Sequence, residues 1–517
     1  TASITDINST TPVLAVMIGL AVGIDYALFI VSRAGEYLAD GVDPAEAAGR
    51  ATATSGGAVV FAGTTVIVAL CGLSVAHIRF LTTMGLASAA VVAVAVLVAL
   101  TVVPALIGIL GERLLPRRRK AADGGADADR RPASRWVRAV TRRPWTTIGA
   151  VIVLLGLCAI PASGLRLALT DNGFAEKGSQ QRETYDAVAA AYGEGYNSPI
   201  VVIADVSQPS DSVAAVQGLA QELSQLDGVE GISLATPNQD GTLALVQIRP
   251  EKSQADPATM ELVHDIRSHA RDYESRYGLT DVMVTGQTAV AIDVAEELNA
   301  ALIPFGVVVV GLSLILLMVV FRSIAVPLTA TLGYLLSLGA GMGAVSAVFG
   351  WGWAADLLAV SKVGAVISFL PVIVMGVLFG LAMDYQVFLV SRMREEWNRR
   401  RGGATPAARH EAAAAVVKAG FLGSAKVVAA AAVIMTGVFV AFVHTDNVYV
   451  KPIGLGLTVG IAADAFLVRM TLIPAIIVAL GERAWWLPAW LDQLLPVVDV
   501  EGESLEQALE QEEADAG

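Results

Sequence analysis

The sequence has 517 residues, of which 55% are hydrophobic and only 16% charged, and its formal net charge is −13. Soluble domains carry about 25% charged residues, so this composition, with a mean hydropathy of +0.62, excludes a large soluble protein and indicates a polytopic membrane protein. The basic residues gather in a few loops, which gives no reason to expect a nucleic-acid partner. Cys71 and Cys158 both lie within apolar runs, so neither a disulfide framework nor a metal cluster is expected.

Nine apolar runs are long enough to cross a bilayer, which takes about 20 residues in a helix. They are residues 12–31, 56–76, 80–110, 145–164, 299–321, 324–349, 364–390, 422–443 and 452–480. An odd number of spans places the two ends of the chain on opposite sides of the membrane.

The distribution of Lys and Arg in the loops predicts the orientation of these spans. The 112–143 loop holds eleven basic residues and the 392–420 loop holds seven, whereas the opposing short loops hold almost none. These two loops are therefore expected in the cytoplasm and residues 165–298 outside. Within the first loop, residues 120–134 have the composition of a flexible linker.

The segment 165–298 differs in kind from the rest of the chain. Its pattern predicts strands and helices in the order β-α-β-β-α-β, at 200–203, 211–226, 230–235, 243–248, 257–276 and 282–285. This order is typical of a ferredoxin-like α+β domain. His264 and His269 in its second helix are five residues apart, which does not suit a shared metal ion, and we expect both at the surface.

The most informative motif begins with Asp25 and Tyr26, deep in the first apolar run. A second copy begins with Asp384 and Tyr385, at an offset of 359, and six of the nine positions from Asp to Arg are identical in the two copies. An Asp at the centre of a membrane helix costs about 2.5–3.5 kcal/mol, so such residues indicate function by default. Two copies of one costly arrangement favour a functional device.

The duplication extends over three helices. Val103–Leu106 matches Ile473–Ile476, and Leu110–Arg113 matches Leu480–Arg483 at the close of the third helix of each copy. Parallel repeats related by an axis along the membrane normal are one established transporter architecture.

With these motifs, and with Gly286–Ala289 leading into a helix, the chain resembles the MMPL family of the resistance-nodulation-division (RND) superfamily of proton-driven exporters. The resemblance implies twelve membrane helices in two six-helix repeats, each with an external porter domain between its first and second helices. The nine runs would then be helices four to twelve, with only the second porter domain present. We therefore expect the sequence to be an N-terminally truncated piece of a longer protein.

This resemblance predicts a division of the chain into six regions. They are the helices of the incomplete first repeat (1–111), a basic cytoplasmic linker (112–144), one span (145–164), the porter domain (165–298), the helices of the second repeat (299–481) and an acidic cytoplasmic tail (482–517).

The resemblance also predicts function. It implies proton-driven export of lipids or other hydrophobic compounds in a bacterial cell membrane, with no cofactor beyond the proton gradient and with accessory envelope proteins as candidate partners besides membrane lipids. Drug efflux is a related alternative, and a receptor or scaffold with a sterol-sensing-like helix bundle is a different one. No catalytic residue is expected, because the five His are scattered and the sequence has neither a nucleophile elbow nor a phosphate-binding glycine loop.

Neighbours on a helix point about 100° apart, so Tyr26 cannot satisfy Asp25 on its own face. If the repeats face each other, Tyr26 can meet Asp384 and Tyr385 can meet Asp25, each phenol donating a hydrogen bond to a carboxylate. The resemblance implies that these crossed pairs form the proton relay. The alternative is that the pairs only join helices together.

Four other polar residues in the spans are weaker candidates. Asp464 and Arg469, five apart in the last span, are expected either to couple to the relay or to serve packing and snorkelling. Ser55 and Ser424 would extend a proton path, although Ser in membrane helices usually bonds to its own backbone.

Overall fold

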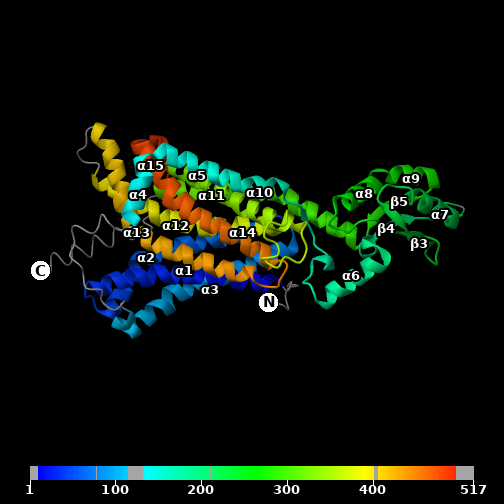
Figure 1. The fold of residues 1–517 in the computed structure, drawn as a ribbon, viewed down its shortest axis with the longest axis horizontal. Coiled ribbons are helices and arrows are strands. Elements are labelled where there is room, and N and C mark those ends of the chain that lie inside the picture. The colour runs from blue at the N-terminus through cyan, green and yellow to red at the C-terminus, as the bar shows by residue number, and fades with distance from the viewer. Residues whose placement is uncertain (1–9, 77, 115–131, 210, 401–405, 496–517) are drawn as a thin grey trace.

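The structure, a computed structural model, describes residues 10–76, 78–114, 132–209, 211–400 and 406–495. At some helical positions, among them Asp384, Tyr385 and Ser424, it describes the backbone and not the side chain. Long helices form a bundle at one end of the elongated molecule, and a small sheet domain lies at the other end (Figure 1).

Seven helical segments among the described residues are long and apolar enough to cross a membrane. They are α1 (Thr10–Ala39), α2 (Pro44–Cys71) with its following turn, α3 (Arg79–Leu110), α5 (Pro144–Ala159) with its following turn, α10 (Gln287–Phe321), α11 (Ala325–Val345) with its following turn, and the continuous run of α14 (Val450–Ala462), η8 (Ala463–Leu472) and α15 (Ile473–Leu480). The other two predicted spans fall on α12 (Leu370–Arg400) and α13 (Pro406–Val443), whose described apolar parts are shorter. The prediction of a polytopic helical membrane protein is confirmed.

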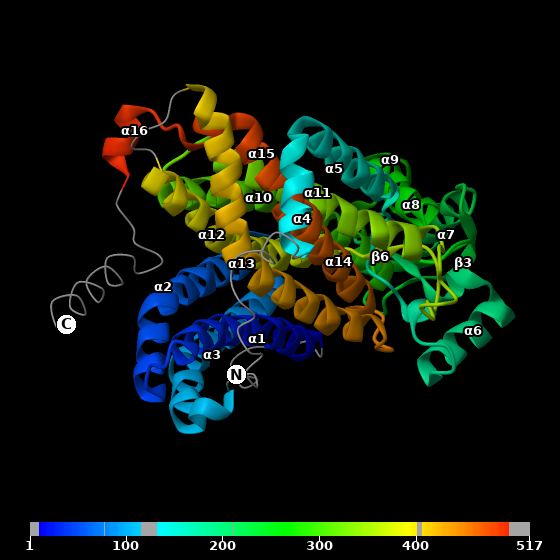
Figure 2. The ribbon, with the colours of Figure 1, turned by 60° about the vertical axis from the view of Figure 1, so that its left-hand side comes forward.

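The helices of the two predicted repeats meet inside the bundle. α1, α2 and α3 pack against one another, α2 contacts α12, and α1 contacts α13 (Figure 2). The approach of α2 to α12 is close, because a Cβ placed on Gly380 would lie 2.8 Å from Val66 Cγ2 and 3.2 Å from Val66 Cα. Glycine at position 380 therefore allows the backbones of α2 and α12 to come together.

The external domain contains the predicted ferredoxin-like arrangement. Its strands β2 (Ile200–Asp205), β3 (Val229–Pro237), β4 (Leu243–Pro250) and β5 (Thr280–Thr285) form an antiparallel sheet in the order β3-β4-β2-β5. Helices α7 (Ser212–Leu223), α8 (Pro257–Ser268) and α9 (Ala270–Tyr277) accompany the sheet, and buried side chains such as Val202, Leu219 and Val263 share one core. The predicted single helix over 257–276 is two helices, because the backbone leaves the helical conformation at His269.

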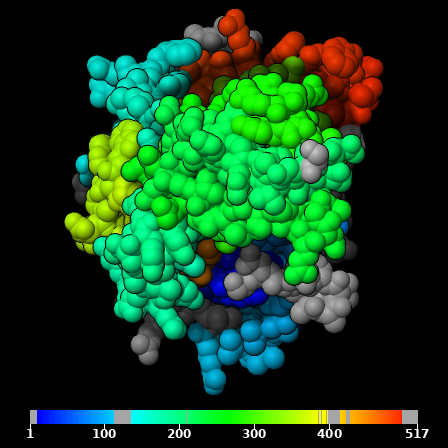
Figure 3. Space-filling view, turned by 90° about the vertical axis from the view of Figure 1, so that its right-hand side faces the viewer, coloured from blue at the N-terminus to red at the C-terminus, as the bar shows by residue number. Residues whose placement is uncertain are grey.

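Two connections join this domain to the bundle. α10 runs from the domain into the bundle as one helix of 35 residues. On the other side, β1 (Leu167–Ala168) pairs in parallel with β6 (Val366–Ile367), just before α12 begins. Viewed along the long axis, the sheet domain, with α6 (Gln180–Tyr192) beside it, covers much of the outer end of the bundle (Figure 3).

Two segments predicted as a linker and a tail contain helices. α4 (Pro132–Arg142) lies across α13 and α15 at the end of the bundle opposite the external domain, and buries Val137 and Val140 there. α16 (Ala489–Leu494) is held by an ion pair of 2.7 Å between Asp492 and Arg322. The predicted flexible linker is therefore wrong for residues 132–134, and residues 120–131 and 496–517 lie outside the described residues.

Candidate functional site

Asp25 and Tyr26 lie in the interior of the bundle, near the middle of α1, and each residue is only 1% exposed. Gly63 of the neighbouring helix α2 faces the phenol ring, because a Cβ placed on it would lie 3.6 Å from Tyr26 Cε2, an ordinary van der Waals distance. The same Cβ would lie 2.3 Å from Val96 Cγ2 of α3. Three helices thus converge closely beside Tyr26, which agrees with the expectation of a buried motif.

The second copy of the motif lies on α12, one turn after Gly380. The side chains of Asp384 and Tyr385 lie outside what the structure describes, so the crossed pairing with Asp25 and Tyr26 stays a prediction. The backbone nevertheless places this copy on the helix that packs against α2, and α2 also packs against α1.

An ion pair joins Asp464 and Arg469 within the last membrane-spanning run. Asp464 Oδ2 contacts the Arg469 guanidinium, and the two residues are 5% and 1% exposed. Both lie in η8, a π-helix, in which hydrogen bonds connect residues five apart. This geometry brings together two side chains that an α-helix would place on different faces. Such π-helical segments are frequent at functional sites.

The Arg469 guanidinium also reaches the second copy of the motif. Its Nη2 donates to the carbonyl oxygens of Leu381, at 3.4 Å, and Ala382. These carbonyls lie two and three residues before Asp384. The Arg469 side chain is buried, points into the bundle and is held there by a carboxylate and two carbonyls, and its part in coupling stays a prediction.

Polar side chains that the sequence analysis missed lie around the same part of α12. Ser313 of α10 lies 3.1 Å from Thr331 of α11, hydroxyl to hydroxyl, and its Oγ lies 3.7 Å from Met383 Sδ. Gln386 is 3% exposed, and its Nε2 has no hydrogen-bond partner among the described residues. The signal was present in the sequence: Ser313 and Thr331 interrupt apolar runs, and Gln386 replaces Ala27 of the first copy.

The two serine candidates are less informative. Ser55 is half-buried on α2, and the side chain of Ser424 on α13 lies outside what the structure describes. Their part in a proton path stays a prediction.

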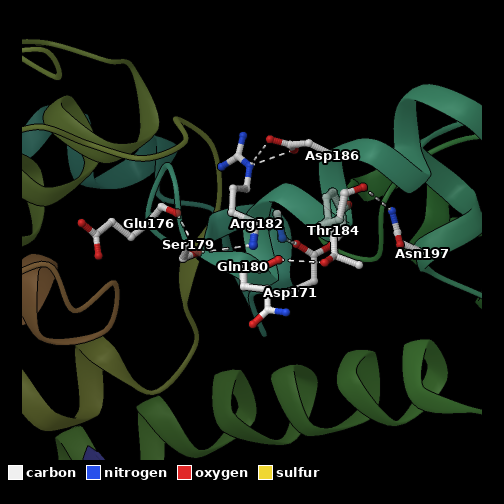
Figure 4. Close-up of polar contacts among 10 residues, drawn as sticks. Asp171, Glu176, Ser179, Gln180, Arg182, Thr184, Asp186 and Asn197 are labelled. Carbon is white, nitrogen blue, oxygen red and sulfur yellow. Dashed lines mark hydrogen bonds and ion pairs between the residues drawn. The ribbon is translucent and has the colours of Figure 1, made fainter.

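A cleft of about 350 Å³ opens where the external domain meets the bundle, between residues 170–181 and the 446–449 loop. On its wall, Asp171 Oδ2 accepts a hydrogen bond of 3.1 Å from the Tyr185 hydroxyl. Ser179, also on the wall, caps α6 by accepting from the Arg182 backbone N–H (Figure 4). Burial and the neighbouring Asp171 carboxylate raise the pKa of Tyr185 above its usual value, so the phenol stays protonated. The Lys362 ammonium lies over the Phe174 ring, 5.1 Å from its centroid.

His264 and His269 lie at the surface of the external domain, as expected. The His264 side chain is 49% exposed and pairs with Glu296 at 2.6 Å, while the His269 ring contacts the carbonyl of Asp265. Among the residues that the structure describes, no cluster of three His, Cys, Asp or Glu could hold a metal ion.

Buried acidic and basic groups in an apolar helix bundle can bind and release protons and can transmit a change of charge between helices. Asp25 supplies a carboxylate of this kind on α1. Arg469 supplies a permanent positive charge beside the second copy of the motif, because guanidinium groups stay protonated in proteins.

The sequence model of the MMPL family matches residues 1–147 and 176–493. The chain is 41% identical over 508 residues to membrane protein YdfJ of Bacillus subtilis, covering 98% of this chain and 68% of that protein. It is 31% identical over 497 residues to the mycolic acid-containing lipids exporter MmpL11 of Mycolicibacterium smegmatis, and 28% identical over 520 residues to the trehalose monomycolate exporter MmpL3 of Mycobacterium tuberculosis. These alignments cover 94% and 92% of this chain but 50% and 53% of those proteins, so the chain spans about half the length of these two exporters.

A solved structure supports the fold. The translocon-associated membrane protein SecDF from Thermus thermophilus superposes with a TM-score of 0.52 at 14% identity, over 91% of this chain and 54% of that one.

Proposed function

This chain belongs to the MMPL family of the RND superfamily, and we propose that it serves the proton-driven export of lipids or other hydrophobic compounds across the cell membrane, with the proton gradient as its only energy source. The observation that carries the proposal is the burial of Asp25 and Tyr26 inside the bundle, together with the repetition of their motif at Asp384 and Tyr385.

In the proposed mechanism, Asp25 and Asp384 alternately bind and release protons. Tyr26 and Tyr385 donate hydrogen bonds to the carboxylates across the repeats, and these bonds weaken when a carboxylate becomes protonated. Each proton that crosses the membrane supplies about 2.3 kcal/mol per 100 mV of potential. The resulting rearrangement of α1 against α12 would move the external domain and the bound compound.

The contacts of Arg469 support a part in this coupling. The guanidinium binds carbonyls on the turn of α12 that precedes Asp384, and it is paired with Asp464 of the same helix. Protonation of Asp384 would remove a negative charge from the same stretch of α12 whose carbonyls this guanidinium binds, and would shift the balance of its contacts toward Asp464. The last membrane-spanning run would then respond to the protonation state of the relay.

The relatives support the substrate class. Two of them are named as exporters of mycolic acid-containing lipids and of trehalose monomycolate. For this chain we propose a hydrophobic compound with a polar head, and the cleft lined by residues 170–181 and the 446–449 loop is a candidate for contact with the head.

The test measures proton uptake into vesicles containing the whole chain, with an internal pH-sensitive dye and an imposed pH gradient. We expect Asp25→Asn and Asp384→Asn each to reduce uptake at least tenfold, because Asn keeps the shape of the side chain and cannot carry the proton. Asp240→Asn in an exposed turn of the external domain is the matched control and should behave as the wild type.

The same vesicles distinguish the alternative functions. Proton uptake that increases with an added fluorescent lipid and not with soluble drugs supports lipid export. Uptake that neither Asp variant changes would contradict the relay, and a chain that moves no protons would favour the receptor or scaffold.

A further inference from the structure

An arginine-rich amphipathic helix lies at the end of the bundle opposite the external domain. From Arg130 to Trp145 the sequence contains six Arg and no acidic residue, and the structure describes α4 within this stretch. Figure 1 shows that α4 runs across the long axis of the bundle, where it contacts α13 and α15. α4 ends two residues before α5, a candidate membrane span that begins at Pro144, and this order would place α4 where the bilayer meets water.

The two faces of α4 differ sharply. Val137 and Val140 are 1% and 4% exposed and pack against the bundle. Arg135 and Arg142 are exposed, and their spacing of seven residues, with Arg138 between them, places all three on one helical face. The charged face is therefore presented outward along the membrane boundary.

Two exposed tryptophans in or next to α4 also indicate a position at the membrane boundary. Trp136 and Trp145 are 47% and 69% exposed, and indole rings concentrate at the boundary between acyl chains and headgroups. A basic amphipathic helix with Trp at this depth has the chemistry that binds anionic lipid.

We propose that α4 binds the headgroups of anionic phospholipids in the leaflet at this end of the bundle, through Arg135 and Arg142. The proposal goes beyond the export function and does not depend on it. It identifies the occupant as a phospholipid because the charged face is fixed at headgroup depth beside two exposed indoles.

The bound lipid would hold α4 against the charged π-helix. The Trp136 indole N–H donates a hydrogen bond of 3.1 Å to the carbonyl of Met470, the residue next to Arg469. Lipid bound on the outer face of α4 would stabilise this contact on its inner side. Anionic lipid is therefore expected to slow hydrogen exchange at the backbone amides of both α4 and η8.

The test uses the whole chain in a neutral detergent, titrated with short-chain phosphatidylglycerol or phosphatidylcholine, with bound lipid counted by native mass spectrometry. We expect phosphatidylglycerol to bind in preference, with an affinity that falls as salt is added. Arg135→Gln with Arg142→Gln should weaken this binding about fivefold for each arginine, the contribution of one basic residue near an anionic surface.

Two variants control for charge and folding. Lys252→Gln with Arg271→Gln removes the same charge from exposed positions of the external domain and should bind as the wild type. Arg135→Lys with Arg142→Lys keeps the charge and should retain most of the binding. A Gln variant that binds phosphatidylglycerol as the wild type does, or a control variant that weakens equally, would overturn the proposal.

Two further experiments test whether the arginines bind a free anion or the acidic tail and not a phospholipid. Inorganic phosphate at the same concentration should not displace the lipid, and displacement would show a site for free anions instead. Deletion of Val498–Gly517 removes the strongly acidic end of the tail and should leave the effect of the Gln variant unchanged. If the deletion abolished that effect, the arginines would bind the tail, and the lipid proposal would be wrong.

Discussion

The third helices of the two repeats have related sequences but different interiors. The matches at Val103 and Ile473 give an offset of 370, which aligns Asp464 with Val94 and Arg469 with Ala99. α3 is α-helical throughout and 22% of its apolar window is buried, whereas the run containing η8 is 72% buried and has a π-helix at the equivalent place. One copy is thus an apolar helix at the side of the bundle, and the other carries an ion pair in its centre.

This difference indicates that the charged pair is not required to build such a helix. A buried ion pair is weak evidence for stability, because removing two charges from water costs about as much as their attraction returns. The pair is therefore more informative about function than about folding, and it belongs to the repeat whose motif it contacts.

The largest expected effect tests this difference directly. Arg469→Met keeps much of the side-chain length but leaves Asp464 buried without its ion-pair partner, which costs about 3–5 kcal/mol of stability. Adding Asp464→Val, the residue of the first repeat, should recover most of this loss while proton uptake remains low. Unfolding of the purified chain in detergent and proton uptake in vesicles measure the two effects.

Arg182→Ala breaks an exposed ion pair with Asp186 and serves as the control, with an expected loss of about 0–1 kcal/mol. A double variant at Asp464 and Arg469 that stayed as unstable as the single one would show that the pair is structural.

The next largest loss of stability is expected when the glycines that pack beside the two motifs are replaced by alanine. Gly380→Ala would bring a methyl group against the Val66 backbone, which cannot rotate away, and should cost about 1–3 kcal/mol. Gly63→Ala meets the side chain of Val96, which can change rotamer, and should cost less. Gly437→Ala has nothing within 4 Å and is the control for unfolding measurements. An equal loss of stability in the Gly63→Ala and Gly380→Ala variants would contradict the prediction that the substitution at Gly380 costs more.

A smaller effect is expected from the contact between α4 and η8. Trp136→Phe removes the indole donor to Met470 and keeps the aromatic ring, so it should cost about 0.5–1.5 kcal/mol locally. Hydrogen exchange of residues 132–142 should accelerate while exchange in α3 stays constant. Unchanged exchange in α4 would show that the hydrogen bond contributes nothing.

The smallest effect concerns the external domain alone. The His269 ring bonds to the Asp265 carbonyl, which raises the pKa of His269 above its ordinary value of 6.5. The contact therefore favours the folded domain below about pH 6.5, and this contribution is lost as the pH rises through the raised pKa. NMR titration should give a midpoint above 6.5, and His269→Gln should remove the pH dependence. A His269 titration midpoint at or below pH 6.5 would contradict the predicted rise in its pKa.

Much of the fold could be predicted from local patterns. The strands predicted at 200–203 and 243–248 agree with β2 and β4 within two residues, because runs rich in β-branched and aliphatic residues favour extended backbone. The Asp25 and Asp384 motifs were found because charge in an apolar run is rare.

The rest depends on tertiary contacts or on geometries without a sequence signature. The π-helix was missed because the apolar pattern around Asp464 and Arg469 is also compatible with an α-helix. α4 was missed because its many arginines resemble a linker, although Val137 and Val140 beside Trp136 were the signal of a packed face. The contact of Arg469 with α12 joins residues 87 positions apart, which no local pattern reveals.

The short ladder between β1 and β6 limits where the outer domain can bend. It fastens the segment entering that domain to the segment entering α12, so no hinge can lie within residues 167–168 or 366–367. The other connection, α10, is a rod about 52 Å long at 1.5 Å per residue. The domain is therefore attached to the bundle by one continuous helix and one two-residue ladder, and a tilt of α10 relative to α12 would have to be accommodated by the residues that follow Ala168.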